Sequence, residues 1–342
     1  MKDLRKGAAI RWAALAVPWL WFPLKGIHPS FELIAIGLPL LIVVALLLAT
    51  GVLLVRRSLR SGLLIVSIAA FAAVAIFLPA RPLSTPEPDE TFRVASVNVA
   101  RQWFSHNDIG FLAFEEEPDV FFLSEMSVSH DTELRERFDF GIADIVDEDP
   151  IPSLAEQGFQ AAEVTPDSFR RFDQPSLGVY SNFEMERLPD PLDGVIDGGL
   201  PGFRLLVRAD TGDFVLYALH LPKIGNDPEG VFEVSFGEQR EIVEAIVAAT
   251  EAEDLPVVIA GDLNIVDRGS SYDALTGAMT DAMRESRWAT PTRARTLTHT
   301  LLLLRIDHVF VSPSLCAAST PRVLDVLYTD HSPLLVDVGP CA

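Results

Sequence analysis

Apolar residues form two long, nearly uninterrupted runs near the start of the 342-residue chain. Residues 31–55 contain one acid, Glu32, and are otherwise apolar or small, while residues 62–80 contain no charge. Because about 20 apolar residues are enough for a helix to cross the core of a bilayer, both runs predict transmembrane helices. Residues 8–28 are a third candidate: charges and prolines interrupt them, but their tryptophans suit a membrane interface. A cleaved signal peptide is the alternative there, although no clean cleavage site precedes the next run.

Basic residues predict how these helices are oriented. The sequence RRSLR (56–60) lies between the second and third apolar segments, and more basic residues stand at the N-terminus. Positively charged loops stay in the cytoplasm, so both groups are predicted to be cytoplasmic. We therefore expect a multi-pass anchor over 1–81 in the cytoplasmic membrane, a proline-rich acidic linker over 82–90, and an extracytoplasmic domain over 91–342.

After residue 90 the pattern changes to short segments that alternate or are wholly apolar, as strands do. Such segments lie at 91–100, 115–125, 176–182, 203–222 (a hairpin around Asp-Thr-Gly), 257–260, 306–313 and 332–338. Residues 238–253 instead show apolar positions at helical spacing, and 139–175 are expected to be irregular or an insertion. Many strands with a few helices between them predict a mixed α/β or α+β sandwich.

Polar residues recur at the ends of these strands. They are Asn98, Glu125, His220, Asp262 with Asn264, Asp307, and the pair Asp330 and His331 just before the last strand. One such residue is usually a cap or a turn former, but the whole set supplies carboxylates, amides and histidines together. Side chains two apart in a strand share a face, so Asp262 and Asn264 belong to one site. Oxygen ligands of this kind hold hard divalent cations, and the inventory suits metal-assisted hydrolysis of a phosphate ester.

At these residues the chain resembles the endonuclease/exonuclease/phosphatase superfamily of Mg²⁺-dependent phosphoesterases. The matching stretches are SVNVA, FFLSE, ALHLP, GDLN, RIDHVFVS and TDHSPLLVDV, in the family's order over roughly 92–338. The resemblance implies an α/β (α+β) four-layer sandwich of two mixed β-sheets flanked by helices, with the site at one edge of the sheets. It also implies Mg²⁺ as cofactor, and Mn²⁺ would suit the same oxygen ligands.

The resemblance assigns a role to each matching residue. Glu125 is expected to be the principal metal ligand, with Asn98 beside it and help from Asp330. The expected catalytic residues are Asp262 on the attacking water, Asn264 and His220 on the phosphate, and His331 oriented by Asp307. Whether Asp262 or His331 takes the proton stays open. A neighbouring carboxylate should raise the pKa of His331 and favour its charged form.

Other residues have weaker claims on the site. Asn107 resembles a second asparagine of membrane-anchored, lipid-directed relatives and is a candidate substrate-binding residue, with a turn role as the alternative. His299 could also line the pocket, whereas His308 alternates with Asp307 and should pack in the core. Position 100 is Ala where some nuclease relatives carry an acid, which makes a DNA-repair nuclease less favoured.

The charge of the domain and the predicted membrane anchor together limit the classes of substrate that we expect. From residue 91 onward the chain holds 18 basic and 43 acidic residues, which disfavours a nucleic-acid partner. An external phosphoesterase on a membrane anchor is expected to act on a lipid-linked phosphate, such as a phospholipid or a polyprenyl pyrophosphate. The alternatives are an extracellular or periplasmic DNA nuclease and a non-catalytic receptor. The two cysteines, Cys316 and Cys341, could form a disulfide outside the cytoplasm, but their spacing does not establish it.

Overall fold

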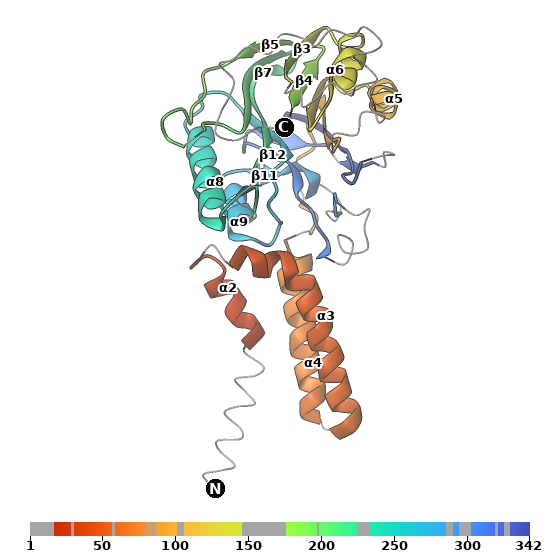
Figure 1. The fold of residues 1–342 in the computed structure, drawn as a ribbon, viewed down its shortest axis with the longest axis vertical. Coiled ribbons are helices and arrows are strands. Elements are labelled where there is room, and N and C mark those ends of the chain that lie inside the picture. The colour runs from red at the N-terminus through yellow and green to blue at the C-terminus, as the bar shows by residue number, and fades with distance from the viewer. Residues whose placement is uncertain are drawn as a thin grey trace, which may run out of the picture.

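The globular part of the chain contains two β-sheets with helices on their outer faces (Figure 1). The computed structural model describes residues 17–28, 31–56, 59–79, 81–83, 86–100, 106–145, 176–196, 198–224, 233–284, 290–293, 302–318, 321–324 and 329–342. The sequence predicted two mixed sheets flanked by helices, and the structure confirms this part of the prediction.

The first sheet has seven strands. Their order is β13 (Leu315–Ala317), β15 (Leu334–Pro340), β1 (Phe92–Asn98), β2 (Val120–Ser124), β4 (Leu177–Ser181) and β3 (Phe140–Asp144), and β14 (Arg322–Val323) pairs with β15. Among its described strands β1 and β2 are the parallel pair, so both reach the same edge with their C-terminal ends.

The second sheet has six strands. Their order is β11 (Thr280–Asp281), β12 (Asp307–Val311), β10 (Val257–Asp262), β7 (Gly212–His220), β6 (Gly202–Ala209) and β5 (Glu184–Arg187). Here β7 and β10 are the parallel pair. Two further short strands, β8 (Lys223–Ile224) and β9 (Glu233–Val234), pair with each other.

Apolar side chains divide the domain into layers. The inner faces of both sheets share one core, which includes Val94, Phe122, Leu205 and Val258. Outside the first sheet lie α5 (His106–Glu116) and α6 (Val128–Arg135), and outside the second lie α8 (Phe236–Glu251) and α9 (Ser270–Ala278). Buried side chains on both faces of a strand explain why β2 and β10 are wholly apolar until their last residues.

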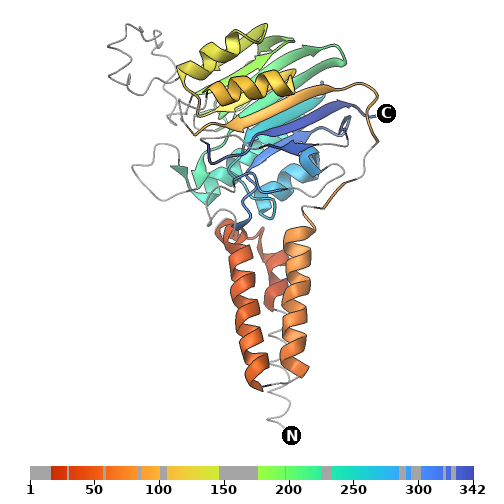
Figure 2. The same cartoon turned by 90° about the vertical axis from the view of Figure 1, so that its right-hand side faces the viewer.

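A helical hairpin projects from one end of this domain (Figure 2). It consists of α3 (Phe31–Arg56) and α4 (Leu59–Ala72), which continues through a π-helical turn, η2 (Ala73–Phe77). A short 3₁₀ turn, η1 (Val17–Leu20), and the single turn α2 (Trp21–Leu24) pack beside the hairpin through Trp19 and Trp21.

The prediction of three transmembrane helices is wrong for the part of the chain that the structure describes. One helix, Phe31–Val55, is long and apolar enough to cross a membrane. The apolar part of the next helical segment, Gly62–Phe77, is shorter because the helix ends before Pro79, which cannot continue it. The described residues of the 8–28 candidate, 17–28, form only two short turns around Pro18 and Pro23.

Cys316 and Cys341 form a disulfide with a Cα–Cα distance of 5.0 Å. The bond joins β13 to the end of β15, and thus ties the C-terminus to the edge of the first sheet. The sequence had left this pairing open.

Candidate active site

The polar residues at the strand ends converge because the two parallel strand pairs finish at the same edge of the sandwich. Asn98 ends β1 and Asp262 ends β10, and the two belong to different sheets. The Asn98 amide Nδ2 donates hydrogen bonds to Glu125 Oε1 and to Asp262 Oδ2, each at 3.0 Å. One amide therefore joins the two sheets at the site and holds two carboxylates together.

Left-handed backbone conformations direct two of the side chains, those of Glu125 and Asn264, toward the site. Glu125 directly follows β2 and Asn264 lies two residues beyond the end of β10, and their φ angles are 54° and 49°. Such conformations are uncommon for residues other than glycine and cost about 1–3 kcal/mol each. The GDLN motif also requires its glycine: Gly261 has a φ of 145°, and a Cβ atom there would lie 1.8 Å from the Leu219 carbonyl oxygen. Backbone strain thus gathers around these strand ends.

Asp262, Asp307 and His331 form the buried centre of the site. Asp262 and Asp307 are directly paired between β10 and β12. His331 Nδ1 lies 3.0 and 2.9 Å from the two oxygens of Asp307, and its Nε2 lies 3.8 Å from Asp262 Oδ2. The imidazole is therefore held by one carboxylate and faces the other. Together with Asn98 and Glu125 we call these residues the strand-end cluster.

His331 and Asp262 are the two groups that could transfer the proton, and their surroundings shift the pKa of each. Burial opposes the charge of His331, but Asp307 and Asp262 outweigh it and raise the pKa of His331 to about 9. Burial and the nearby charge of Asp307 raise the pKa of Asp262 above its usual range. At neutral pH His331 is consequently an imidazolium, which can donate a proton or stabilise negative charge, and Asp262 is the group of the pair that is left to accept a proton.

Glu125 lies at the more accessible side of the cluster, with 14% of its side chain exposed. Burial alone would raise its pKa, but His220, the Asn98 amide and Lys223 together hold the pKa below its usual range. His220 Nε2 lies 3.6 Å from Glu125 Oε1 and 3.7 Å from Asp262 Oδ2. Burial lowers the pKa of His220, although the charges of Asp262 and Glu125 act in the opposite direction.

Asn264 is held in place by its own neighbours. Its backbone N–H donates to Asp262 Oδ1 at 3.0 Å, and its side-chain Nδ2 donates to the Leu221 carbonyl at 2.8 Å. The Asn264 carbonyl in turn accepts from Gln239 of α8. Since an amide nitrogen carries two hydrogens, one of them can still be offered to a phosphate oxygen.

The structure gives the remaining predicted residues different surroundings. Asp330 pairs with Arg293 at 2.6 Å, and one of its oxygens lies 3.9 Å from His331 Nε2. Asn107 is exposed in the first turn of α5, and within the described residues it takes no part in the hydrogen bonds that join the strand-end cluster. His299 lies outside the described residues. The metal role of Asp330 and the substrate roles of Asn107 and His299 stay predictions.

Sequence reasoning missed several residues that complete the site. Lys223 Nζ lies 3.8 Å from Glu125 Oε1 and supplies a partly exposed cation at the mouth of the cluster. Thr292 Oγ1 accepts from the backbone N–H groups of Ile306 and Asp307, and Thr329 Oγ1 donates to the Asn98 carbonyl. Lys223 follows His220 by three positions in HLPK, which was the available signal. The threonines stand in loops without periodicity.

His308 packs in the core, as the alternation along β12 predicted. It is fully buried, stacks on Phe310, and lies 3.2 Å from Arg305 through Nδ1. Arg305 also contacts Asp281 at 2.6 Å and the Tyr272 hydroxyl at 3.0 Å. We call this group, with Asp267 at 3.4 Å from Arg305 Nε, the Arg305 cluster.

The strand-end cluster fits a hard divalent cation. Asp262, Asp307 and His331 can each place a ligand atom within 4.8 Å of the others. However, His331 is committed to Asp307 and raised in pKa, so an imidazolium ligand is disfavoured. Glu125 and Asp262, bridged by Asn98, offer oxygen atoms of the type that Mg²⁺ and Mn²⁺ prefer.

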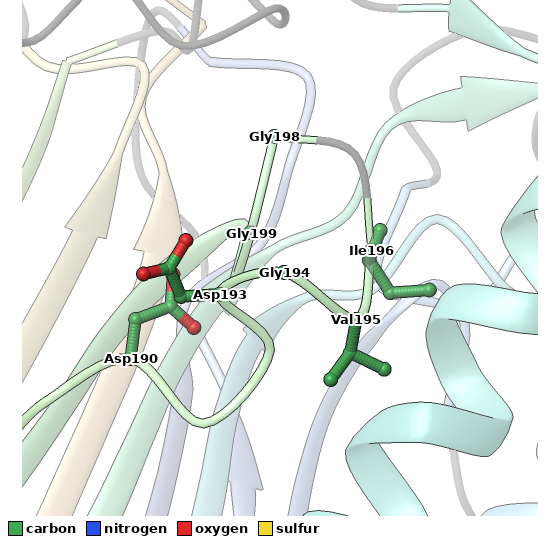
Figure 3. A pocket seen from close by; sticks show the side chains of 7 residues that line it. All are labelled: Asp190, Asp193, Gly194, Val195, Ile196, Gly198 and Gly199. Atoms are coloured by element: carbon green, nitrogen blue, oxygen red, sulfur yellow. The ribbon is translucent and has the colours of Figure 1, made fainter.

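A hollow of about 600 Å³ lies elsewhere, in the loop between β5 and β6 (Figure 3). It is lined by Asp190, Asp193, Gly194, Val195, Ile196, Gly198 and Gly199. Asp190 uses both carboxylate oxygens to accept from the backbone N–H groups of Leu192 and Leu200. These contacts shape the loop itself, and none of the residues of the strand-end cluster lines this hollow.

Comparisons with known proteins agree with this geometry. A model of the endonuclease/exonuclease/phosphatase family matches residues 93–331. No curated protein matches the chain closely enough to count as a relative.

Several solved structures are similar to this chain. Danio rerio TDP2, in complex with a single-stranded DNA product, is 15% identical over 73% of this chain and 100% of its own, with a TM-score of 0.50. A mannosyl-6-phosphatase from Bacteroides thetaiotaomicron is 17% identical over 72% and 99%, with a TM-score of 0.46. Sphingomyelinase C from Streptomyces griseocarneus is 14% identical over 72% and 99%, with a TM-score of 0.47. At these identities the likeness concerns the fold alone.

Proposed function

The chain belongs to the endonuclease/exonuclease/phosphatase family, and from this premise we propose that it is a metal-dependent phosphoesterase acting at a membrane. Its substrate would be a phosphate ester or pyrophosphate carried by a membrane lipid or a polyprenyl carrier. The observation that carries the chemistry is the strand-end cluster, in which Asn98 holds Glu125 and Asp262 together while His331 stays charged beside them.

Each residue of the cluster has a distinct task in such a reaction. Glu125, with Asp262 beside it, would hold Mg²⁺ or Mn²⁺, which supplies Lewis-acid stabilisation of the phosphoryl oxygens. Asp262 orients the attacking water and accepts its proton. His331, kept protonated by Asp307, stabilises the charge that develops on the phosphate and donates a proton to the leaving oxygen. Asn264 offers its second amide hydrogen to a phosphate oxygen.

The helical hairpin supports a membrane location. The part of α3 beyond Pro39 has 16 residues up to Val55, or about 24 Å of helix at 1.5 Å per residue, which approaches the roughly 30 Å hydrocarbon thickness of a bilayer. Its side chains are mostly exposed, among them Leu47 and Leu48 at 68% each. We include in the proposal that the shorter apolar segment Gly62–Phe77, formed by α4 and η2, makes a second crossing beside α3, with basic residues 56–60 in the cytoplasm and the domain outside.

Two further features support an extracytoplasmic lipid substrate. The Cys316–Cys341 disulfide suits an oxidising compartment. The excess of acids in 91–342 would repel the long polyanion of a nucleic acid, whereas one phosphate headgroup can be bound by a metal ion and a few cations such as Lys223.

The first experiment uses the full chain in detergent with Mg²⁺. We expect phosphate release from a polyprenyl pyrophosphate in mixed micelles, and intact supercoiled plasmid in a parallel assay. Glu125→Gln and His331→Ala should each lower release by about 100-fold or more, the usual effect of removing a group used in acid–base or electrostatic catalysis. Glu184→Gln, a change at an exposed glutamate of β5, is the matched control and should leave release unchanged.

Two outcomes would contradict the proposal. Plasmid nicking that disappears in both site variants would make the protein a nuclease despite its charge. An absence of metal-dependent release from a polyprenyl pyrophosphate and from phospholipids would show that the substrate class is wrong.

A further inference from the structure

The first turn of α3 is built into the globular domain. Glu32 is 4% exposed, and its Oε1 accepts from the backbone N–H of Ser270 at 2.6 Å, the Ser270 hydroxyl at 2.5 Å and the Ser271 N–H at 3.3 Å. These groups form the N-terminus of α9, whose own N-cap residue is Gly269 and has no side chain to supply. A carboxylate from the apolar helix therefore caps a helix of the domain.

Gly269 shows how closely the two parts fit. A Cβ atom at this position would lie 2.0 Å from Glu32 Oε2. The φ angle of Gly269 is −82°, which any residue can adopt. The backbone thus does not demand glycine here, but any side chain at this position would have to displace the Glu32 carboxylate.

Arg268 makes a second and deeper connection. Its side chain is buried, and its Nε donates to the Ala35 carbonyl of α3 at 2.5 Å while Nη2 donates to Ile36 at 3.2 Å. The reason lies in α3 itself, which contains Pro39. Proline has no N–H to offer the carbonyl four residues earlier, so Ala35 lacks its helical partner and Arg268 replaces it.

The same guanidinium also holds a loop of the active site. Its Nη2 donates to the Leu302 carbonyl at 2.7 Å and Nη1 to that of Leu303 at 3.3 Å. Leu303 is held in a left-handed conformation, with a φ of 49°. This loop leads directly to Asp307, and Arg268 itself follows Asn264 by four positions.

Apolar contacts complete the interface. Val266, from the loop that follows Asn264, and Ile306, just before Asp307, are buried in one cluster with residues of α3 and α4 such as Ala35 and Phe71. Both loops that present site residues from the second sheet therefore rest on the helical hairpin.

We propose that α3 is a positioning element of the active site and not a flexible tether. Arg268 and Glu32 lock it to the loops that carry Asn264 and Asp307, so that the catalytic groups and the apolar helix move as one body. The pairing itself is independent of the reaction, whereas its effect on turnover rests on the proposed phosphoesterase function.

A double-mutant cycle tests the pairing without any substrate. Arg268→Met removes the donors from four carbonyls and should lower the melting temperature of the detergent-solubilised chain by roughly 10 °C. Pro39→Ala gives α3 back the N–H that Ala35 lacks. It should therefore raise the melting temperature of the Arg268→Met chain more than that of the wild type. Equal effects of Pro39→Ala in the two backgrounds would overturn the pairing.

A spectroscopic readout tests the positioning. If Asp307 shifts when its loop is released, it no longer supports the charge of His331, and the His331 pKa should fall by about one unit or more. Titration of histidine ¹³Cε1 signals in the Arg268→Met chain measures this fall. Arg187→Met, which removes an exposed arginine paired with Asp144, is the matched control and should leave the His331 signal unchanged. An unchanged His331 pKa in the Arg268→Met chain would overturn the positioning role.

Turnover completes the test. Arg268→Met should lower kcat by up to about 100-fold, since small misplacements of catalytic groups have effects of this size, with little change in KM. If Arg268→Met does not accumulate, Arg268→Lys retains the charge but cannot bridge both pairs of carbonyls, and the same readings apply. A chain with no phosphoesterase activity would refute the proposed function while the melting and titration data still decide the interface.

Discussion

Two clusters of buried charge lie on opposite faces of β12, and their compositions differ. In the Arg305 cluster the guanidinium contacts Asp281, Asp267, the Tyr272 hydroxyl and His308, and the Tyr272 hydroxyl also donates to Asp281 at 2.6 Å. Charges and hydrogen-bonding groups are matched there. A network of this kind is structural, because every member already has its partners.

The strand-end cluster is unbalanced by comparison. Its three carboxylates, Glu125, Asp262 and Asp307, face one charged imidazole, that of His331. The neighbouring imidazole of His220 has a lowered pKa. Left-handed residues border this cluster, whereas none of the five residues of the Arg305 cluster has a positive φ. The comparison teaches that burial of charge alone does not mark a site, and that excess charge together with strain does.

The largest expected effect comes from breaking the balanced cluster. Arg305→Met leaves the Asp281 carboxylate buried without its main counter-charge, which should lower the free energy of unfolding by about 3–5 kcal/mol. Urea unfolding of the detergent-solubilised chain measures this loss. Arg208→Met, which removes an exposed arginine between Glu186 and Asp213, should change it by less than about 1 kcal/mol. Similar values for the two variants would refute the structural role.

A smaller effect should appear in the pH dependence of stability. The pKa of His331 is raised to about 9 in the folded chain, and an unfolded histidine titrates near 6.5. The stabilisation is therefore fully present below about pH 6.5 and is lost as the pH rises through 9, which amounts to about 3 kcal/mol. Unfolding curves from pH 6 to 10 should show this fall in the wild type and a flatter profile in His331→Gln. Parallel profiles would contradict the His331–Asp307 pairing.

The smallest effect should have the opposite sign. The pKa of Asp262 is raised by burial and by Asp307, so its carboxylate is less stable in the folded chain than in water at neutral pH. Asp262→Asn should therefore increase the free energy of unfolding, by up to about 1–2 kcal/mol, while it abolishes turnover. A loss of stability in Asp262→Asn would show that this carboxylate stabilises the fold, as the charges of the Arg305 cluster do, and would contradict the difference between the two clusters.

Much of the fold could be predicted from the sequence because the strands carry their own signals. β2 and β10 are apolar until a polar residue ends each one, and parallel strands bring such ends to one edge. Asn98, Glu125, Asp262 and Asp307 could thus be grouped before their contacts were known. His308 could be assigned to the core from its alternation with Asp307 alone.

The rest depended on contacts that no local pattern reports. The partner of Arg268 is a carbonyl 233 positions earlier, and the capping of α9 by Glu32 crosses a similar separation. The anchor was overestimated because hydropathy counts residues past the point where Pro79 ends the helix. Arg293, the partner of Asp330, stands in a loop with no period to follow.

Pro39 also determines the order in which α3 and the globular domain reach their final structure. Ala35 leaves the ribosome more than 200 residues before Arg268, the side chain that satisfies its carbonyl. During that interval the first long helix carries an unmet hydrogen-bond acceptor, and it reaches its final form only after the domain has folded onto it. Folding of this protein is therefore complete only when the domain has closed onto the first turns of α3, which were synthesised long before it.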